Sequence, residues 1–159
     1  MRILHFVSVF EKKASGLSFS VPNLIKAQNF NKKERISFEY NIKNGICLRK
    51  VNFNKYNIFE LHSFFNLPYL RLLLFIPKSK IIICCPRGAF SKLSRYSIKK
   101  QIYALMYFYI IRFRKLNICI HYLTQNEKVN SRFHAKNEFI VGNCISLDNI
   151  SNNYDNDYY

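Results

Sequence analysis

The stretch from residue 80 to residue 90 joins a short apolar run to residues that can bind an anion. It reads Lys-Ile-Ile-Ile-Cys-Cys-Pro-Arg-Gly-Ala-Phe, and the β-branched run predicts a buried strand that ends at Pro86. In an open parallel sheet, ligands bind in the crevice outside the carboxyl ends of the strands. Arg87 offers a rigid fork of donors for phosphate or carboxylate, and Gly88 lets the backbone approach a ligand. The alternative is a Pro-Gly turn with a solvated arginine.

The elements that must position this stretch alternate along the chain. Strands are predicted at 2–8, 36–40, 46–51, 57–63, 80–85, 117–124 and 139–141. Helices are predicted from Pro22 onward and at 68–75, 97–115 and 125–132. This alternation predicts an α/β fold, a single Rossmann-like domain over residues 1–147 with a mainly parallel sheet and helices on both faces. The Asn- and Asp-rich residues 148–159 are expected to be a frayed tail.

The composition agrees with one folded domain and indicates an anionic partner. The chain has 159 residues, of which 49% are hydrophobic and 16% aromatic, enough for one domain with a real core. Its formal net charge of +16 favours nucleic acid, anionic lipid or phosphorylated substrates. Lys12 and Lys13 follow the first apolar run, unlike a signal peptide, and no run is long enough to span a bilayer. We therefore expect a cytoplasmic protein.

Several other features carry no predicted chemistry. The 5 cysteines are an odd number without metal-ligand spacing, so we interpret them as reduced residues and predict no metal site. With 4 glycines, the sequence has no dinucleotide-binding or Walker motif. His5 and His121 lie inside predicted strands and are interpreted as core histidines. The triplet 155–157, Asp-Asn-Asp, is interpreted as solvated charge in the tail.

Two groups of segments, taken in sequence order, resemble a known enzyme family. The first group is the apolar start at 1–8, a loop with Ser15-Gly16, and the Ser-Val-Pro-Asn-Leu stretch at 20–24. The second is Pro-Arg-Gly-Ala-Phe-Ser at 86–91, the basic helix, and Ile-His-Tyr-Leu-Thr at 120–124. In this order and at this separation they resemble the N-terminal, acceptor-side half of a family 4 glycosyltransferase with the GT-B architecture, in its Pro-Arg-Gly branch.

Two further segments match that family less closely. Residues 57–63 resemble its Asp-hydrophobic-hydrophobic-His-hydrophobic-His-Gly strand, with Glu60 where the first His usually stands and His62 at the second. Residues 139–145 resemble its strand ending in Pro-Asn-Gly-Ile/Val, although Gly142 and Cys144 depart from it. The resemblance extends over about residues 1–147.

The resemblance implies sugar transfer from a nucleotide-sugar to a hydroxyl acceptor, in the synthesis of surface polysaccharide, O-antigen or capsule. It implies no metal and no cofactor besides the nucleotide-sugar substrate. In this family a second Rossmann-like domain binds the donor, and the sequence ends near the point where its linker should begin. We therefore expect an acceptor-side half that is inactive alone, with a donor-binding domain on a separate chain and a lipid-linked or saccharide acceptor.

The same resemblance assigns roles to individual residues. Ser15 and Gly16 fall on the glycine loop that meets donor phosphate and acceptor. Arg87 and Gly88 fall on the acceptor site, where Arg87 is expected to hold an anionic group of the acceptor or the diphosphate. His62 is expected to orient an acceptor hydroxyl, so His62 and Arg87 are the catalytic candidates. Arginine stays protonated and therefore cannot serve as the base. For His62 the alternative is a loop histidine without substrate contact.

The predicted helix 97–115 has an apolar middle between basic ends. One interpretation is a core-facing helix with solvated ends. The other is docking on the inner face of the plasma membrane, since lipid-linked acceptors require the domain to sit on an anionic leaflet. In that case the membrane-surface residues are Lys99, Lys100, Arg112, Arg114 and Lys115.

Two other functions remain open on the sequence. A basic nucleic-acid-binding module would use Lys and Arg on phosphates and aromatic residues on bases, but no RNA- or DNA-binding motif is legible. An inactive, truncated remnant of the enzyme would carry the same sequence signals as the acceptor-side half.

Overall fold

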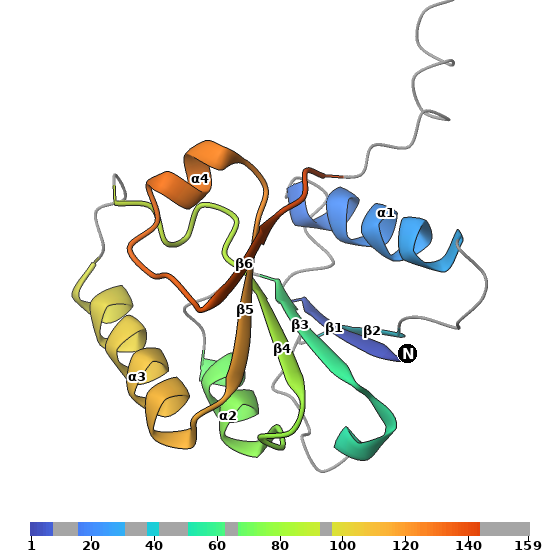
Figure 1. The fold of residues 1–159 in the computed structure, drawn as a ribbon, viewed down its shortest axis with the longest axis horizontal. Helices are drawn as coiled ribbons and strands as arrows, with labels where there is room; N and C mark the ends of the chain where they lie inside the picture. The colour runs from blue at the N-terminus through green and yellow to red at the C-terminus, as the bar shows by residue number, and fades with distance from the viewer. Residues whose placement is uncertain (8–15, 31–37, 42–50, 63–66, 93–96, 144–159) are drawn as a thin grey trace, which may run out of the picture.

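The computed structural model describes residues 1–7, 16–30, 38–41, 51–62, 67–92 and 97–143, and in them the protein forms one parallel sheet (Figure 1). The strand order is β2-β1-β3-β4-β5-β6, and every pair of neighbours is parallel. The strands are β1 Ile3–Val7, β2 Phe38–Asn41, β3 Ile58–His62, β4 Ile81–Cys85, β5 Asn117–Tyr122 and β6 Asn137–Ile140. The helices are α1 Gly16–Phe30, α2 Leu67–Phe75, α3 Ile98–Arg114 and α4 Gln125–Val129. The predicted α/β class with a single Rossmann-like domain is confirmed.

The order of the strands reverses beside β1. From β1 the chain moves outward on one side to β2, and it then returns to the other side of β1 and proceeds through β3 to β6. Such a reversal leaves a crevice outside the carboxyl ends of the two central strands, here β1 and β3. The fold therefore points to that edge as the place for a site.

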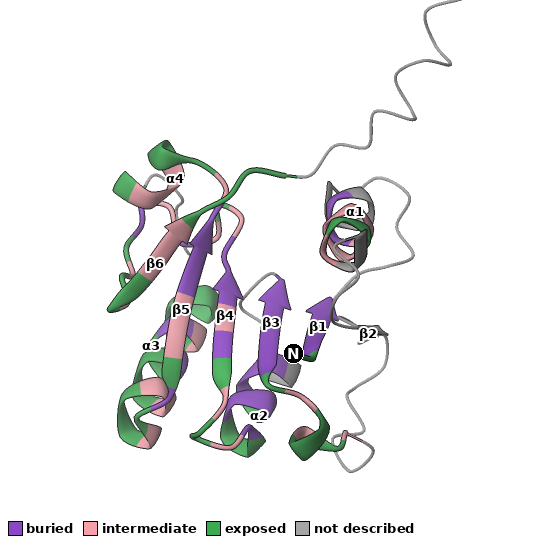
Figure 2. Cartoon of the chain, turned by 45° about the vertical axis from the view of Figure 1, so that its right-hand side comes forward, coloured by how far each residue is buried: buried purple, intermediate pink, exposed green. Residues whose placement is uncertain are grey.

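Helices cover both faces of the sheet, but the two faces differ in chemistry. Facing α2 and α3, buried apolar side chains form the hydrophobic core, including Leu4, Phe6, Phe59, Leu61 and Ile82. Because side chains alternate along a strand, the residues between these face α1 instead. Figure 2 shows that β1 and β3 are buried along their whole length, so both faces of these strands are covered.

The ends of α3 follow from local chemistry. The Ser97 hydroxyl accepts a hydrogen bond from the Lys100 N–H at 3.4 Å, as an N-cap side chain does. Arg112 and Arg114 lie in the last turn, where positive charge suits the helix dipole. Lys115 closes the helix in a left-handed conformation, with φ 50°. The predicted helix at 97–115 is thus confirmed.

The first helix differs from the prediction. We expected a loop up to Ser20 and a helix that opens at Pro22, but α1 begins at Gly16 and contains Pro22 in its interior. Proline there removes one backbone hydrogen bond, and the residues before it still form the first turns of the helix. The predicted strand at 46–51 falls almost wholly outside the described residues, and the tail at 148–159 lies entirely outside them. Within the described residues, no helix is both long enough and apolar enough to cross a membrane.

Candidate functional site

Arg87 lies at the carboxyl end of β4 and joins three separate segments. Its Nη1 donates hydrogen bonds to Ser20 Oγ in α1 and to Asn143 Oδ1 beyond β6, both at 2.9 Å. The backbone makes this possible, because Arg87 and Gly88 both adopt positive φ, 49° and 78°. For arginine this conformation is disfavoured by about 1–2 kcal/mol. A strained residue at a ligand-binding edge indicates a functional constraint.

The guanidinium of Arg87 retains binding capacity after these contacts. Its Nε atom is buried and has no hydrogen-bond partner among the described residues. The next residue, Gly88, is exposed, and its N–H donates to Glu127 Oε1. Glu127 in turn accepts from the Leu123 N–H at 2.7 Å. The turn after β4 is therefore held from α4, and it presents a cation at the carboxyl edge.

Beside Arg87, five polar side chains meet on the α1 face of the sheet; we call His5, Glu60, His62, Cys85 and His121 the buried polar cluster. The register pairs His5 with Glu60 and His62 with Cys85, so these residues point to one face. All five are buried. Four adjacent strands, β1, β3, β4 and β5, thus each contribute to a single cluster near their carboxyl ends.

Glu60 is the centre of this cluster. Its Oε2 lies 3.3 Å from His5 Nδ1, and its Oε1 lies 3.5 Å from His121 Nδ1 and 3.1 Å from Cys85 Sγ. His62 Nε2 lies 3.0 Å from His5 Nδ1 and 3.9 Å from Glu60 Oε1. The rings of His5 and His62 stack with centroids 5.3 Å apart. The Glu60 carboxylate therefore connects His5 and His62 with Cys85 and His121.

Burial sets the protonation states in the buried polar cluster. It lowers the pKa of His62 to about 3 and lowers the pKa of His5 against the attraction of Glu60. Burial alone would raise the pKa of Glu60, but the contacts with His121, His62, His5 and Cys85 outweigh it and lower that pKa to about 2. Burial, reinforced by Glu60, raises the pKa of the Cys85 thiol well above its usual range. At neutral pH Glu60 is therefore a carboxylate, while His5, His62 and the Cys85 thiol are uncharged.

The predicted catalytic pair is divided between two environments. Arg87 lies at the carboxyl edge as expected, whereas His62 is fully buried at the end of β3. Its contacts are with other residues of the cluster, so its position does not support the expected contact with an acceptor hydroxyl. Gly16 is the first residue of α1 rather than part of a loop, and Ser15 lies outside the described residues.

The predicted membrane-surface residues also differ from one another. Lys99, Lys100, Arg112 and Lys115 are exposed. Arg114 instead donates to the backbone carbonyl of Leu73 and joins α3 to α2. Arg114 therefore takes part in the packing of the two helices.

The apolar side chains of α3 divide between the core and the surface, with Tyr103, Ile110 and Ile111 packed against the core beside Tyr107. The residues expected to pack against the core are all exposed: Ile102, Leu105, Met106, Phe108 and Tyr109. Ala104 and Tyr107 are the buried residues of the helix. The interpretation of α3 as a core-facing helix is thus confirmed for the side that carries Ala104 and Tyr107, which meets the sheet. It is wrong for the five exposed residues.

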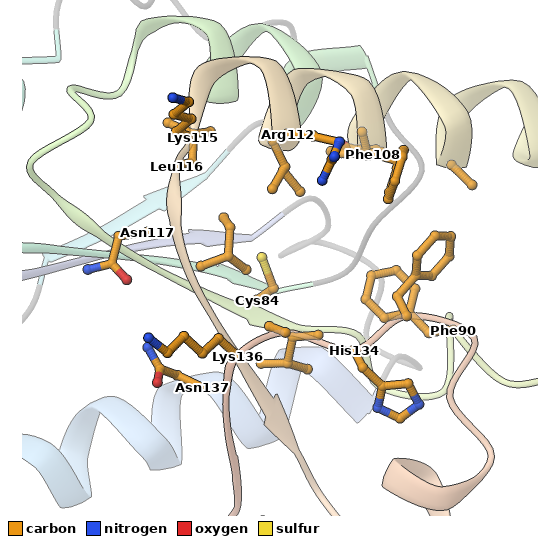
Figure 3. Close-up of a pocket in the computed structure, with 17 residues that line it drawn as sticks. Cys84, Phe90, Phe108, Arg112, Lys115, Leu116, Asn117, His134, Lys136 and Asn137 are labelled. Carbon is orange, nitrogen blue, oxygen red and sulfur yellow. The ribbon is translucent and has the colours of Figure 1, made fainter.

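A cavity of about 470 Å³ lies on the opposite side of the sheet from Arg87, between α3, β5 and the segment before β6 (Figure 3). Its walls are mostly apolar and include Phe90 and Phe108. Arg112, Lys115 and Lys136 add positive charge, and the lining contains no acidic residue. This arrangement suits a ligand that is apolar and negatively charged.

The buried polar cluster was not predicted, although the sequence contains part of its signal. Glu60 and His62 stand two residues apart in an apolar strand, a spacing that places both on one face. His5 and His121 were each interpreted alone as core histidines. The partners of Arg87, Ser20 and Asn143, gave no signal, because their proximity depends on how α1 and the end of β6 are placed.

Comparisons with known proteins add no assignment. No protein-family model matches this chain, and neither the curated proteins nor the solved structures contain a significant match. The chemistry of the site must therefore be inferred from its own residues.

Proposed function

We propose that this chain is the acceptor-binding, Rossmann-like half of a GT-B glycosyltransferase, acting on an acceptor that carries a phosphate or carboxylate group. The observation that carries the proposal is the position of Arg87, a strained cation at the carboxyl edge of a parallel sheet, beside the reversal of strand order. Ligands of such sheets bind at this edge. The proposal is also supported by the ordered motifs at 1–24, 57–63 and 86–124 that resemble that family.

In this proposal Arg87 binds and orients the acceptor. Nη1 is already committed to Ser20 and Asn143, which fix the plane of the guanidinium. The remaining Nη2 offers donors for an anionic oxygen, while Nε is buried and has no hydrogen-bond partner among the described residues. Gly88 lets the acceptor approach the backbone of the turn. Arg87 remains a cation throughout, so deprotonation of the acceptor hydroxyl belongs to another group.

The buried polar cluster supports this turn from beneath. Cys85 ends β4 two residues before Arg87, and the charge of Arg87 acts on both Cys85 and His62. His62 is therefore a positioning residue in this proposal, since it holds the edge without touching a ligand. Sugar transfer would further require a donor-binding domain.

The surface of α3 favours an acceptor that resides in a membrane. Ile98, Leu105, Tyr109 and Phe113 lie on one stripe of α3 and are between 58% and 88% exposed. Arg112 and Lys115 are exposed close to it. Apolar side chains flanked by cations suit the surface of an anionic leaflet. We propose that this stripe places the domain at the inner face of the plasma membrane, where a lipid-linked acceptor is reached.

The test is isothermal titration of the full chain with a short lipid-diphosphate-sugar acceptor and with a panel of nucleotide-sugars. We expect the affinity for the acceptor to fall at least about tenfold in Arg87→Ala, because the guanidinium donors and the positive charge are both lost. The affinity should partly recover in Arg87→Lys, which restores the charge but not the planar group of donors. Nucleotide-sugars alone are expected not to bind.

Arg71→Ala is the matched control, since Arg71 is an exposed arginine on α2. This variant should bind the acceptor as the unmodified chain does. Equal losses in both variants would mean that net charge, and not the site, attracts the acceptor. Failure of a folded chain to bind any acceptor would overturn the proposal and favour an inactive remnant. Tight binding of an unrelated oligonucleotide would favour a nucleic-acid-binding module instead.

A further inference from the structure

The buried polar cluster contains more hydrogen-bond acceptors than donors. His5 Nε2 lies 3.0 Å from the amide oxygen of Gln28, and His121 Nε2 lies 2.9 Å from the backbone oxygen of Val141. Both oxygens can only accept, so each Nε2 must carry the proton. In a neutral imidazole the other nitrogen then has a lone pair. With both rings neutral, the two Nδ1 atoms that face Glu60 are acceptors.

The cluster has fewer protons to donate than it has acceptor atoms that need one. Glu60 offers two carboxylate oxygens, and the Nδ1 atoms of His5 and His121 add two more acceptors within 3.5 Å of them. Against these four acceptors stand two protons, on His62 Nε2 and on the Cys85 thiol. Arg87, the cation whose charge reaches the cluster, donates through Nη1 to Ser20 and Asn143.

A negative charge that is only 2% exposed also needs a positive partner. A metal cation would satisfy the surplus lone pairs and the charge together.

We propose that Glu60, Cys85 and His121 bind a divalent metal ion of the zinc class. Zinc bonds to sulfur, nitrogen and oxygen of about 2.0–2.3 Å place neighbouring ligand atoms about 3.3–3.6 Å apart in a tetrahedron. The three separations here are 3.1 Å, 3.3 Å and 3.5 Å, for Sγ to Oε1, Sγ to Nδ1 and Nδ1 to Oε1. The ligand atoms therefore already have nearly the spacing of a metal shell.

The surroundings match what such an ion requires. A ligating histidine usually donates its other N–H to a carbonyl or carboxylate, as His121 does to Val141. On binding, the Cys85 thiol releases its proton to solvent and becomes a thiolate. The thiolate and the Glu60 carboxylate then neutralise the two positive charges, so the buried site carries no net charge. A single carboxylate with a thiol and an imidazole does not suit Mg²⁺ or Ca²⁺, which take oxygen ligands.

Such an ion would connect β3, β4 and β5 near the turn that presents Arg87. The ligands come from three adjacent strands, and all three are buried. This inference does not depend on the proposed function.

The neighbouring cysteine provides a matched control. Cys84 is the adjacent residue of β4, but it points into the apolar core on the other face. Cys84→Ala and Cys85→Ala thus each remove one buried thiol from the same strand, and the proposed ligand is lost in only one of them.

The experiment uses the full chain, freed of metal by a chelator and then titrated with Zn²⁺ and, for spectroscopy, Co²⁺. We expect one ion per chain, a higher unfolding temperature with Zn²⁺, and a thiolate-to-cobalt charge-transfer band with the absorption of tetrahedral Co²⁺. Cys84→Ala should retain the band. Cys85→Ala should lose it and bind Zn²⁺ at least about 100-fold more weakly, since loss of an outer partner alone costs 10–100-fold.

Three outcomes would overturn the inference. One is a folded chain that binds neither ion. Another is a cobalt spectrum without a thiolate band in the unmodified chain, a result that does not depend on the folding of any variant. The third is binding that survives in Cys85→Ala and His121→Ala but is lost in His5→Ala, which would move the ion to the other side of Glu60.

Discussion

The two faces of the sheet use the same strands for different purposes. On β3, Phe59 and Leu61 point toward α2 and α3, while Glu60 and His62 point toward α1. The first face is an apolar core in which Phe6, Phe59 and Leu61 are fully buried. The second is equally buried but titratable. We conclude that burial in this protein does not distinguish packing from chemistry, whereas the type of side chain does.

The difference between the faces lies in what each requires of its neighbours. Apolar packing is non-directional, and its contribution grows with the area removed from water. Polar groups need a partner for every donor and acceptor. Within the described residues, two buried side-chain atoms lack a hydrogen-bond partner, His62 Nδ1 and Arg87 Nε, and both belong to the α1 side. The apolar face is complete, while the polar face is where a ligand or ion has something to satisfy.

The largest effect should follow from removing an aromatic ring on the apolar face. Phe59 packs against Phe6, Phe53 and Tyr56, with ring centroids 6.3 Å, 5.7 Å and 6.1 Å away. Phe59→Ala should lower the free energy of unfolding by about 3–5 kcal/mol, through lost burial and the cavity left behind. Urea unfolding followed by circular dichroism measures this.

The control for that prediction comes from the surface. Phe113 is 88% exposed, so Phe113→Ala should change the free energy of unfolding by less than about 0.5 kcal/mol. In the chelated protein, Cys85→Ala on the polar face should cost about 1 kcal/mol, because it removes one sulfur atom rather than a ring. A loss for Cys85→Ala as large as that for Phe59→Ala would contradict the contrast between the faces.

A smaller effect should come from acid, and it should act through the polar face. His62 has a pKa of about 3 in the folded chain and 6.5 in the reference state, so the unfolded chain binds more protons between these values. Stability is then full above pH 6.5 and decreases as the pH falls. Glu60, with its pKa lowered from 4.5 to about 2, acts in the same direction at lower pH.

The size of this acid effect follows from the His62 shift. Between pH 6.5 and pH 4 the chelated chain should lose roughly 3 kcal/mol of unfolding free energy, at 1.36 kcal/mol for each unit of pH below the unfolded pKa. His62→Gln should flatten the dependence in this range, because the side chain whose pKa is lowered is removed. An unchanged slope in His62→Gln would show that the polar face does not control acid stability.

The elements of the fold could be predicted because their signals are local. The strands at 57–63 and 80–85 and the helix at 97–115 were recognised from short apolar runs, bounded by proline, and from apolar periodicity between basic ends. The start of α1 could not be predicted in this way, because proline is typical of the first helical position, whereas here the helix continues through Pro22. Proline marks where a helix tolerates a missing hydrogen bond, and that position is not always its first turn.

The site was predictable only in part, for a different reason. Arg87 was found because proline and glycine mark the end of its strand. The buried polar cluster was not found, because His5, Glu60 and His121 come from three strands that are far apart in sequence, and only the register brings them together. The alternation of side chains along a strand predicts which residues of that strand share a face. It does not predict which residue of a neighbouring strand lies opposite each of them.

The smallest effect on stability, and the sharpest distinction between surfaces, is expected on α3. Leu105 and Phe113 are 58% and 88% exposed, so Leu105→Ser with Phe113→Ser should change the free energy of unfolding by less than about 1 kcal/mol. The same change should weaken binding to vesicles that contain anionic phosphatidylglycerol at least about tenfold, since each buried CH₂ contributes about 0.8 kcal/mol at the interface. Sedimentation of the protein with vesicles measures this.

Val129→Ser is the matched control, since Val129 is an exposed apolar residue on α4, away from the stripe. It should bind such vesicles as the unmodified chain does. Binding that is as strong on neutral phosphatidylcholine would remove the role of Arg112 and Lys115, and binding that is insensitive to the double substitution would remove the role of the stripe. Either result would leave the exposed apolar residues of α3 without an assigned role, because they contribute neither to the apolar core on one face of the sheet nor to the buried polar cluster on the other.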